Sequence, residues 1–348
     1  MNLLFADHGD VDEAVWDDLV DRSDEAWFFH QHAFQPTLAA WPNYEQRSFA
    51  LVGDDGAIKA VIPCFVRSDK TLECFGGPAI CAGLGATQRE RTLHAAYSEL
   101  VRLAGKNNCS RIFTRLSQMS PAWRGTRCPR TSPLLPYGYS NELSQTYVID
   151  LTPSLETIWK NLQPHCRTHI RKAEREGCTI RLASASEEDL ETYYEMHCVT
   201  YQRSALRPHP RRYFELIWNH FVRTGQALVF FAEKEGKVLS ADNEIFFKGA
   251  VSGWTAAGLR EAGAIGANNL LHWHAIRWAR EAGAELYESG EAFPGAGEGK
   301  EKGLDGFKKS FGGDLYPIYR GHLELGGGQP GFLRRMLRHP LRFLRSAK

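Results

Sequence analysis

The sequence lacks the features that mark membrane-spanning and secreted proteins. Nowhere in its 348 residues do about 18 apolar residues follow one another, so we expect no transmembrane segment. The first residues carry neither a basic segment nor a long apolar run, which predicts no signal peptide. The eight cysteines are scattered along the chain without a Cys-x-x-Cys pair. This spacing favours reduced thiols and a cytoplasmic location.

The sequence also lacks a large net charge, although its last residues are strongly basic. Its 42 basic and 41 acidic residues give a formal charge of +1, which argues against a protein dedicated to nucleic acids. Residues 330–348 hold six Lys and Arg side chains and no acidic one, with Leu, Met and Phe between them. We therefore expect a basic amphipathic tail, residues 326–348, that contacts the inner membrane from the cytoplasm. The alternative is a disordered tail.

A pattern of strands, glycine turns and helices occurs twice. Alternating apolar runs around Gly56 predict a β-hairpin, and the same pattern recurs around Gly236, 180 positions later. In each half, a further strand and a glycine-rich loop precede an amphipathic helix, which ends at Gly105 and at Gly283, 178 positions apart. We expect a mixed α/β (α+β) fold of two tandem domains with one sheet plan, residues 1–145 and 146–325. A helix over about 155–176 opens the second domain.

Three stretches of the second half carry a family resemblance. They are a basic helix end, a helix followed by a Tyr-Glu-Ser-Gly strand, and a lysine-rich helix closed by Phe-Gly-Gly, at residues 168–177, 269–290 and 302–313. These stretches resemble FemAB-type transferases and their acetyltransferase (GNAT) relatives. The resemblance implies two tandem GNAT-like domains with the acyl-CoA N-acyltransferase fold, of which the first is degenerate. It also implies that the strand within 315–325 returns to the first domain.

The same resemblance implies an N-acyltransferase. Members of the family pass an acyl group from coenzyme A to an amino sugar or a similar amine, or an amino acid from aminoacyl-tRNA to a peptidoglycan precursor. We therefore expect acyl-CoA as the donor and an amino-sugar nucleotide or another cell-envelope or polysaccharide precursor as the acceptor. Aminoacyl-tRNA as the donor is the alternative. A non-catalytic tandem domain that binds a glycan or a protein is a third possibility.

A glycine turn in the second half is the candidate donor site. Arg260, Gly263 and Gly266 precede a helix that begins near Asn268 and Asn269, and backbone N–H groups at a helix start bind phosphates. The turn is similar to the GNAT pyrophosphate loop, with its last glycine one residue late, so the tRNA-dependent alternative stays open. The other interpretation is a plain connector.

Four carboxylates are candidates for the base that takes the proton of the amine. By the resemblance, Glu288 occupies the position of the family's strand aspartate, and Glu291 follows it. Asp242 and Glu244 alternate on one predicted strand, so both side chains point to one face, and burial would raise their pKa values toward those of a base. The alternative is a solvated sheet face or a structural ion pair.

A basic helix face is the candidate acceptor site. Arg167 and Arg171 recur every four residues with Lys172 beside them, and such a cluster could grip a diphosphate. The family match adds Lys308, and Trp254 completes the substrate-binding candidates, with core packing as its alternative. The basic face has a solvated helix surface as its alternative. His165 and His169 lack a third ligand at a telling spacing, so we expect no metal.

Overall fold

The computed structural model describes residues 2–142 and 144–325, which form two compact units. The first unit contains residues 2–142 and 318–325, and the second contains residues 144–317. The tail 326–348, for which we predict membrane contact, lies outside the described residues. Within the described ranges, no helix is both long and apolar enough to cross a bilayer.

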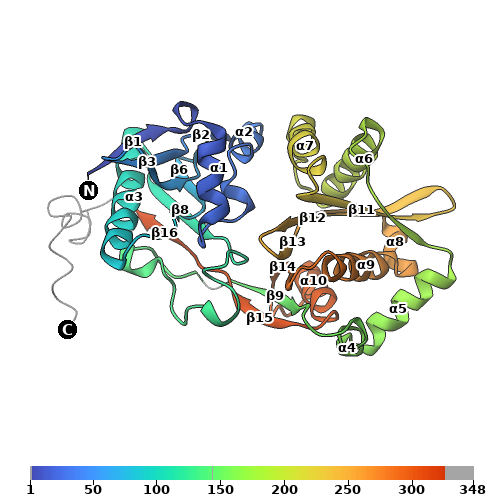
Figure 1. Ribbon diagram of the computed structural model, residues 1–348. Helices are drawn as coiled ribbons and strands as arrows, with labels where there is room; N and C mark the ends of the chain where they lie inside the picture. Colours follow the sequence, from blue (N-terminus) through green and yellow to red (C-terminus); the bar gives the residue numbers. More distant parts are fainter. Residues whose placement is uncertain (1, 143, 326–348) are drawn as a thin grey trace. The chain divides into compact units, whose positions relative to one another are not determined.

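Two sheets build the first unit (Figure 1). A four-stranded antiparallel sheet has the order β1-β3-β4-β7, and a five-stranded mixed sheet has the order β16-β8-β6-β5-β2. The strands are β1 (Leu3–Asp7), β2 (Tyr44–Gln46), β3 (Phe49–Gly53), β4 (Ile58–Ile62), β5 (Cys64–Arg67), β6 (Thr71–Gly76), β7 (Ala79–Ile80), β8 (Arg111–Leu116) and β16 (Arg320–Glu324). Pro63 separates β4 from β5, because proline has no N–H to give to a ladder.

A long helix connects the two parallel strands of the first unit. Helix α3 (Ala86–Lys106) lies between β6 and β8 in sequence and buries Tyr97 and Leu100 in the core of the unit. The helix runs through Gly105, where we expected its end, and Asn108 adopts the left-handed backbone with φ of 54°. The shorter helices α1 (Glu13–Arg22) and α2 (Phe34–Ala39) precede the sheets in sequence.

The first unit is completed by residues from the far end of the described chain. β16 pairs antiparallel with β8 along its full length, from Arg320 with Arg115 to Glu324 with Arg111. The preceding strand, β15 (Asp314–Pro317), pairs with β9 (Gln145–Asp150) in the second unit. The single strand expected within 315–325 is therefore two strands, one in the sheet of each unit.

One seven-stranded sheet builds the second unit, in the order β10-β11-β12-β13-β14-β9-β15. Its remaining strands are β10 (Thr179–Leu182), β11 (Ala227–Lys234), β12 (Lys237–Phe247), β13 (Ala250–Gly258) and β14 (Leu286–Ala292). β13 and β14 are parallel, and α8 and α9 connect them. The first six residues of β11 are buried, because helices cover both faces of this sheet.

The helices of the second unit divide between the two faces of its sheet. Figure 1 shows α6 and α7 on one face and α5, α8 and α9 on the other. The helices are α4 (Leu155–Asn161), α5 (Pro164–Arg175), α6 (Glu187–Arg203), α7 (Arg211–Ile217), α8 (Arg260–Ile265), α9 (Ala267–Glu281) and α10 (Gly299–Lys309). The helix expected over 155–176 is two helices, because Pro164 occupies the first position of α5 and cannot continue α4.

The two units follow one plan. In the first, β1, β3, β4 with β5, and β6 lead through α3 to the parallel strand β8, which has β16 as its antiparallel neighbour. In the second, β10, β11, β12 and β13 lead through α8 and α9 to β14, which has β9 as its antiparallel neighbour. The predicted mixed α/β fold, repeated once along the chain, is confirmed.

Candidate active site

A β-bulge interrupts the sheet of the second unit. Asn243 and Glu244 of β12 pair with Thr255 and Gly253 of β13, so Trp254 is an extra residue on β13. β13 pairs with β14 over Ala250–Ser252, before the bulge, and both strands continue past this pairing. Bulges are frequent beside active sites, because they end strand pairing and redirect side chains.

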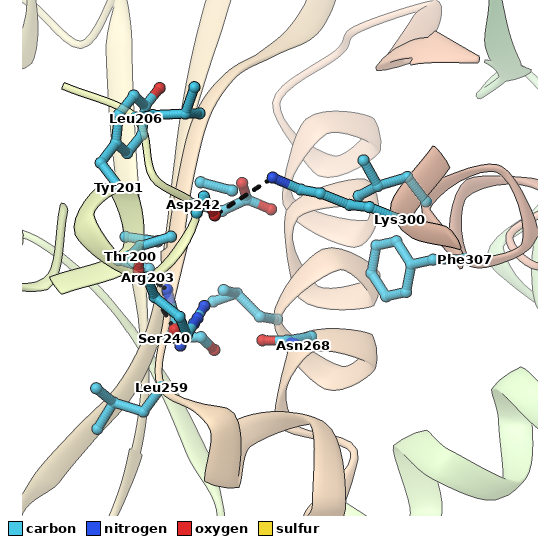
Figure 2. A pocket seen from close by; sticks show the side chains of 17 residues that line it. Thr200, Tyr201, Arg203, Leu206, Ser240, Asp242, Leu259, Asn268, Lys300 and Phe307 are labelled. Atoms are coloured by element: carbon cyan, nitrogen blue, oxygen red, sulfur yellow. Dashed lines mark hydrogen bonds between the residues drawn. The ribbon is translucent and has the colours of Figure 1, made fainter. Parts of the chain in front are cut away.

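A cavity of about 450 Å³ lies beside the far end of β13 (Figure 2). Residues of β12, β13, α9 and α10 and the end of α6 line it. Its apolar wall is made by short and medium side chains: Ala241, Ala256, Ala257, Leu271, Leu304 and Phe307. The alanines leave the space open, because larger residues on β12 and β13 would fill it.

Polar groups face the same cavity from several elements. Arg203 and Lys300 contribute two cations, and the Lys300 ammonium donates to the Ser204 hydroxyl at 3.3 Å. Asn268 contributes an amide from the first turn of α9. The Ser240 hydroxyl is buried and has no hydrogen-bond partner within the described residues. The cavity can thus hold an anionic group and at least one further polar group.

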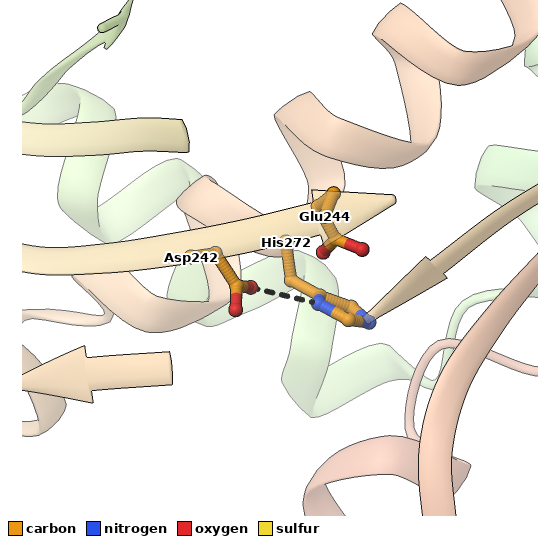
Figure 3. Close-up of side chains that lie close together, drawn as sticks. All are labelled: Asp242, Glu244 and His272. Carbon is orange, nitrogen blue, oxygen red and sulfur yellow. Dashed lines mark hydrogen bonds and ion pairs between the residues drawn. The ribbon is translucent and has the colours of Figure 1, made fainter. Parts of the chain in front are cut away.

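A carboxylate of the cavity wall leads into a buried polar cluster. Asp242 lines the cavity with 15% of its side chain exposed, and its Oδ2 lies 3.4 Å from Nδ1 of His272 on α9. Glu244 follows on the same face of β12 because the bulge belongs to β13 and leaves the alternation of β12 intact. Figure 3 shows Asp242 and Glu244 beside the His272 ring.

Glu244 is buried, and no Lys or Arg among the described residues forms an ion pair with its carboxylate. Its Oε1 accepts a hydrogen bond of 2.5 Å from Tyr287, while its Oε2 has no partner within the described residues. Burial, and secondarily the charge of Asp242, raises the pKa of Glu244 well above its usual value. Burial also raises the pKa of Tyr287, so this phenol keeps its proton. Burial therefore favours the neutral form of Glu244, and its carboxylate lies outside the cavity lining.

His272 also contacts a hydroxyl on the strand that follows its helix. Its Nε2 lies 3.3 Å from Oγ of Ser289 on β14, and its Nδ1 lies 3.3 Å from the Tyr287 hydroxyl. The rings of Phe307 and Phe311 lie 5.7 Å and 4.4 Å from the imidazole. The imidazole is therefore fixed between Asp242 and Ser289 by packing as well as by polar contacts.

Glu288 is fully engaged in holding three strands together. Its Oε1 accepts from the Thr146 hydroxyl of β9 and from the Gly290 N–H at 2.8 Å, and its Oε2 accepts from the Ser252 hydroxyl of β13. Only 1% of the residue is exposed. The structure therefore gives this predicted base a set of partners that stabilises the sheet.

Glu291 and Lys308 lie together where β14 ends. A Glu291 carboxylate oxygen accepts from the Ser144 hydroxyl at 2.5 Å, and the Glu291 carbonyl accepts from the Lys308 ammonium at 2.6 Å. Burial lowers the pKa of Lys308, against the opposite effect of the nearby carboxylates. Lys308 is thus a partly desolvated cation within the second unit.

The predicted donor loop has a different form from the one expected. Residues Arg260–Ile265 form the short helix α8 instead of an open turn, and Arg260 and Gly263 are exposed outside the cavity lining. Gly266 has φ of 84°, and an added Cβ would overlap the His169 carbonyl. This glycine is therefore needed where α5 packs against the α8–α9 junction. Asn268 lines the cavity, whereas Asn269 is buried against the Cys166 sulfur.

Four of the residues predicted to bind the acceptor are engaged elsewhere. Arg167 donates to carbonyls at the end of α4, including that of Lys160 at 3.0 Å. Arg171 lies over the Trp159 ring at 5.4 Å, and Lys172 donates to the Ala264 carbonyl at 2.8 Å. Trp254 contacts the Tyr213 ring edge-on at 6.0 Å. The described cavity lining includes none of these four side chains.

The cluster of Asp242, Glu244 and His272 has the ligand types of a metal site. One ligand atom from each residue lies within 4.8 Å of the other two. The Tyr287 hydroxyl already contacts both Glu244 and His272 in this space. Our expectation that the chain uses no metal stays a prediction.

Sequence reasoning missed the residues that join the cavity to the cluster. His272 and Ser289 fall within the stretch 269–290 that carries the family resemblance, but the sequence assigned neither a role, and Arg203 and Lys300 belong to no motif. One signal in the sequence could have found His272. It is a histidine on the apolar side of a predicted helix, and the strand with Asp242 and Glu244 precedes that helix in the same predicted domain.

A family model matches most of the second unit. Residues 161–308 match the family model described as an acetyltransferase (GNAT) domain. Among curated proteins, none matches the chain significantly. The matched range contains the cavity, the bulge and the Asp242–His272 contact.

Solved structures similar to the whole chain support the tandem fold. FemX has a TM-score of 0.68 at 15% identity over 93% of this chain and 98% of its own. The C-terminal domain of a putative lysylphosphatidylglycerol synthetase from Agrobacterium fabrum has a TM-score of 0.59 at 16% identity, over 90% and 91%. A tandem GNAT protein from the clavulanic acid biosynthesis pathway has a TM-score of 0.57 at 13% identity, over 94% and 100%. The chain therefore has a tandem GNAT fold, and the match of residues 161–308 to a GNAT-type acetyltransferase domain identifies the protein as an acyltransferase.

Proposed function

We propose that the chain transfers an acyl group from acyl-CoA to the amine of an amino sugar or another cell-envelope precursor. The observation that carries this proposal is the cavity beside the β13 bulge, where Arg203 and Lys300 supply cations and Asp242 supplies a carboxylate. Its volume of about 450 Å³ is within the usual range of small-molecule sites, about 300–1,000 Å³.

The cavity has an apolar side and a cationic side, and coenzyme A has an uncharged pantetheine arm and charged phosphates. The apolar wall matches the extended pantetheine arm, which carries no charged group. The phosphates match Arg203 and Lys300 and the first turn of α9, where Asn268 lies. The thioester would then point along the cavity toward Asp242.

Asp242 and His272 supply the acid–base chemistry in this proposal. An amine reaches neutral pH as an ammonium, which the Asp242 carboxylate attracts. Transfer requires the amine to lose a proton, and the Asp242–His272 pair, 3.4 Å apart, accepts it as the nitrogen attacks the thioester carbonyl. A base positioned in this way contributes about 10²–10⁴-fold to the rate.

Thiol release from acetyl-CoA and longer acyl-CoAs, with glucosamine or a nucleotide amino sugar as acceptor, tests the proposal. Asp242→Asn should lower kcat by about 10²-fold or more. Glu261→Gln is the matched control, because Glu261 is an acid of the same unit that is 65% exposed and pairs with Lys237 at 2.9 Å. No acceptor-dependent thiol release with any acyl-CoA, or equal loss in both variants, would refute it.

A FemAB-type transfer from aminoacyl-tRNA to a peptidoglycan precursor is the second candidate. The observation that favours it is the TM-score of 0.68 with FemX over 93% of this chain. Incorporation of a labelled amino acid from aminoacyl-tRNA, with no thiol release from acyl-CoA, would support this candidate over the first.

The cellular setting proposed for either reaction is the cytoplasmic face of the inner membrane, reached through the tail 326–348. Sedimentation with anionic vesicles tests this setting. The full chain should sediment at low salt, and a chain that ends at residue 325 should stay in solution.

A further inference from the structure

We propose that Ser289 is a nucleophile which carries the acyl group as an ester, with His272 as its base and Asp242 as the carboxylate that orients His272. This inference rests on the proposed function for the identity of the donor, and replaces the direct attack of the amine on the thioester by two steps through an acyl-serine. The three residues come from β12, α9 and β14, in the chain order Asp, His, Ser.

The contacts follow the order that such a nucleophile needs. Asp242 Oδ2 lies 3.4 Å from His272 Nδ1, and His272 Nε2 lies 3.3 Å from Ser289 Oγ. An Nδ1 proton held toward the carboxylate leaves the Nε2 lone pair facing the serine hydroxyl. Both distances are somewhat longer than a short hydrogen bond, as is common in unliganded sites, where the contacts tighten only with substrate.

Ser289 differs from Ser252, the buried serine on the adjacent strand, in the partner of its hydroxyl. Ser252 of β13 is buried too, but its hydroxyl donates to the Glu288 carboxylate, which holds the sheet together. The Ser289 hydroxyl instead faces an imidazole. Ser289 also comes directly after Glu288, the last residue of β14 that pairs with β13. Its side chain therefore lies where the two parallel strands stop pairing.

The surroundings supply the remaining parts of an acyl-transfer site. Asp242, which contacts His272, and Leu271, which precedes it in sequence, both line the cavity. His272, the residue that contacts Ser289, is therefore next to the cavity lining. On the other side, Gly290 follows with φ of 85°, and an added Cβ there would lie 3.0 Å from the Lys308 ammonium. A cation so close to the backbone after the nucleophile can stabilise the oxyanion that forms on the acyl carbonyl.

The two half-reactions balance without a further reagent. Ser289 Oγ forms a bond to the carbonyl carbon, the C–S bond breaks, and the serine proton passes through His272 Nε2 to the sulfur, which leaves as a thiol. The amine then forms a C–N bond to the same carbon, the ester C–O bond breaks, and the amine proton returns through His272 to Ser289 Oγ.

p-Nitrophenyl acetate tests the nucleophile without coenzyme A or an acceptor. The full chain should release a burst of one nitrophenolate per molecule, and mass spectrometry of the digest should find an acetyl group on the peptide that contains Ser289. Ser289→Ala should abolish both, and Ser289→Cys should keep the adduct. Ser117→Ala is the matched control, because Ser117 is similarly buried but lies in the first unit. His272→Gln should slow the burst by about 10²-fold or more.

The outcomes separate this inference from the proposed donor. If Ser289→Ala is folded by circular dichroism and transfers acyl groups from acyl-CoA at the wild-type rate without an adduct, the acyl-serine step is wrong and direct transfer stands. If the adduct forms at Ser289 but no acyl-CoA is consumed, the nucleophile stands and the coenzyme A assignment is wrong. An adduct on another residue that survives Ser289→Ala also overturns the inference.

Discussion

Substituting Gly266 by alanine should destabilise the second unit far more than the same substitution at Gly283. Both glycines follow a helix with φ of 84°, so each alanine incurs the cost of the left-handed backbone, about 1–2 kcal/mol. At Gly283 an added Cβ meets no atom within 4 Å, whereas at Gly266 it would overlap the His169 carbonyl of α5. Moving α5 away from the α8–α9 junction adds about 1–3 kcal/mol, as overpacked sites usually do.

Urea unfolding followed by tryptophan fluorescence measures the difference. With a slope of about 2 kcal/mol per molar urea, Gly266→Ala should unfold at a concentration about 0.5–1.5 M below that of Gly283→Ala. The two variants share chemistry and backbone angle, so their difference isolates the overlap with α5. Equal midpoints would show that the junction relaxes freely and that the close approach at Gly266 does not matter.

Three further predictions concern Glu244, Lys308 and Gly321. Burial raises the pKa of Glu244 well above its usual 4.5, so the folded chain keeps a proton that the unfolded chain releases, and stability falls as the pH rises above 4.5. Glu244→Gln should remove this loss, and its urea midpoint should therefore gain on that of wild type between about pH 5 and pH 8. The same difference between variant and wild type at both pH values would contradict this prediction. Lys308→Met should lower kcat by about 10²-fold, whereas Lys309→Met, on the exposed side of the same helix, should not, and steady-state kinetics of the two decides. Gly321→Ala should lower the melting temperature of the first unit alone, because the added Cβ overlaps the Ser140 carbonyl beside β16, and a calorimetric scan in which both units shift together would count against it.

Local patterns predicted the fold well because each element depends on neighbouring residues. The hairpin turns at Gly56 and Gly236 have positive φ, as a tight turn requires, and the apolar stripe of residues 267–282 does face the sheet. The boundary between α4 and α5 was missed because the residues at this point fit two structures. Pro164 suits the first turn of a helix as well as a break, and the amphipathic pattern on both sides of it hid the break.

The site was less predictable because it depends on residues brought together by the sheet. The alternation of Asp242 and Glu244 set them on one face of β12, but their contact with His272 requires α9 to cross that face at one register. Spacing on α5 could not reveal that Arg167 and Lys172 hold the carbonyls of neighbouring helices. Lys300 belongs to a stretch without a motif, and only the packing of α10 brings it to the cavity.

The return of the chain to β16 has a consequence for biosynthesis. A ribosome completes all strands of the second unit by residue 317, but supplies the partner of β8 only when residues 320–324 emerge. The domain synthesised first is therefore the last to be finished, and until then it presents the backbone of β8 as an open edge. Such edges recruit other strands, so fragments that stop near residue 142 should be prone to aggregation and in need of chaperones.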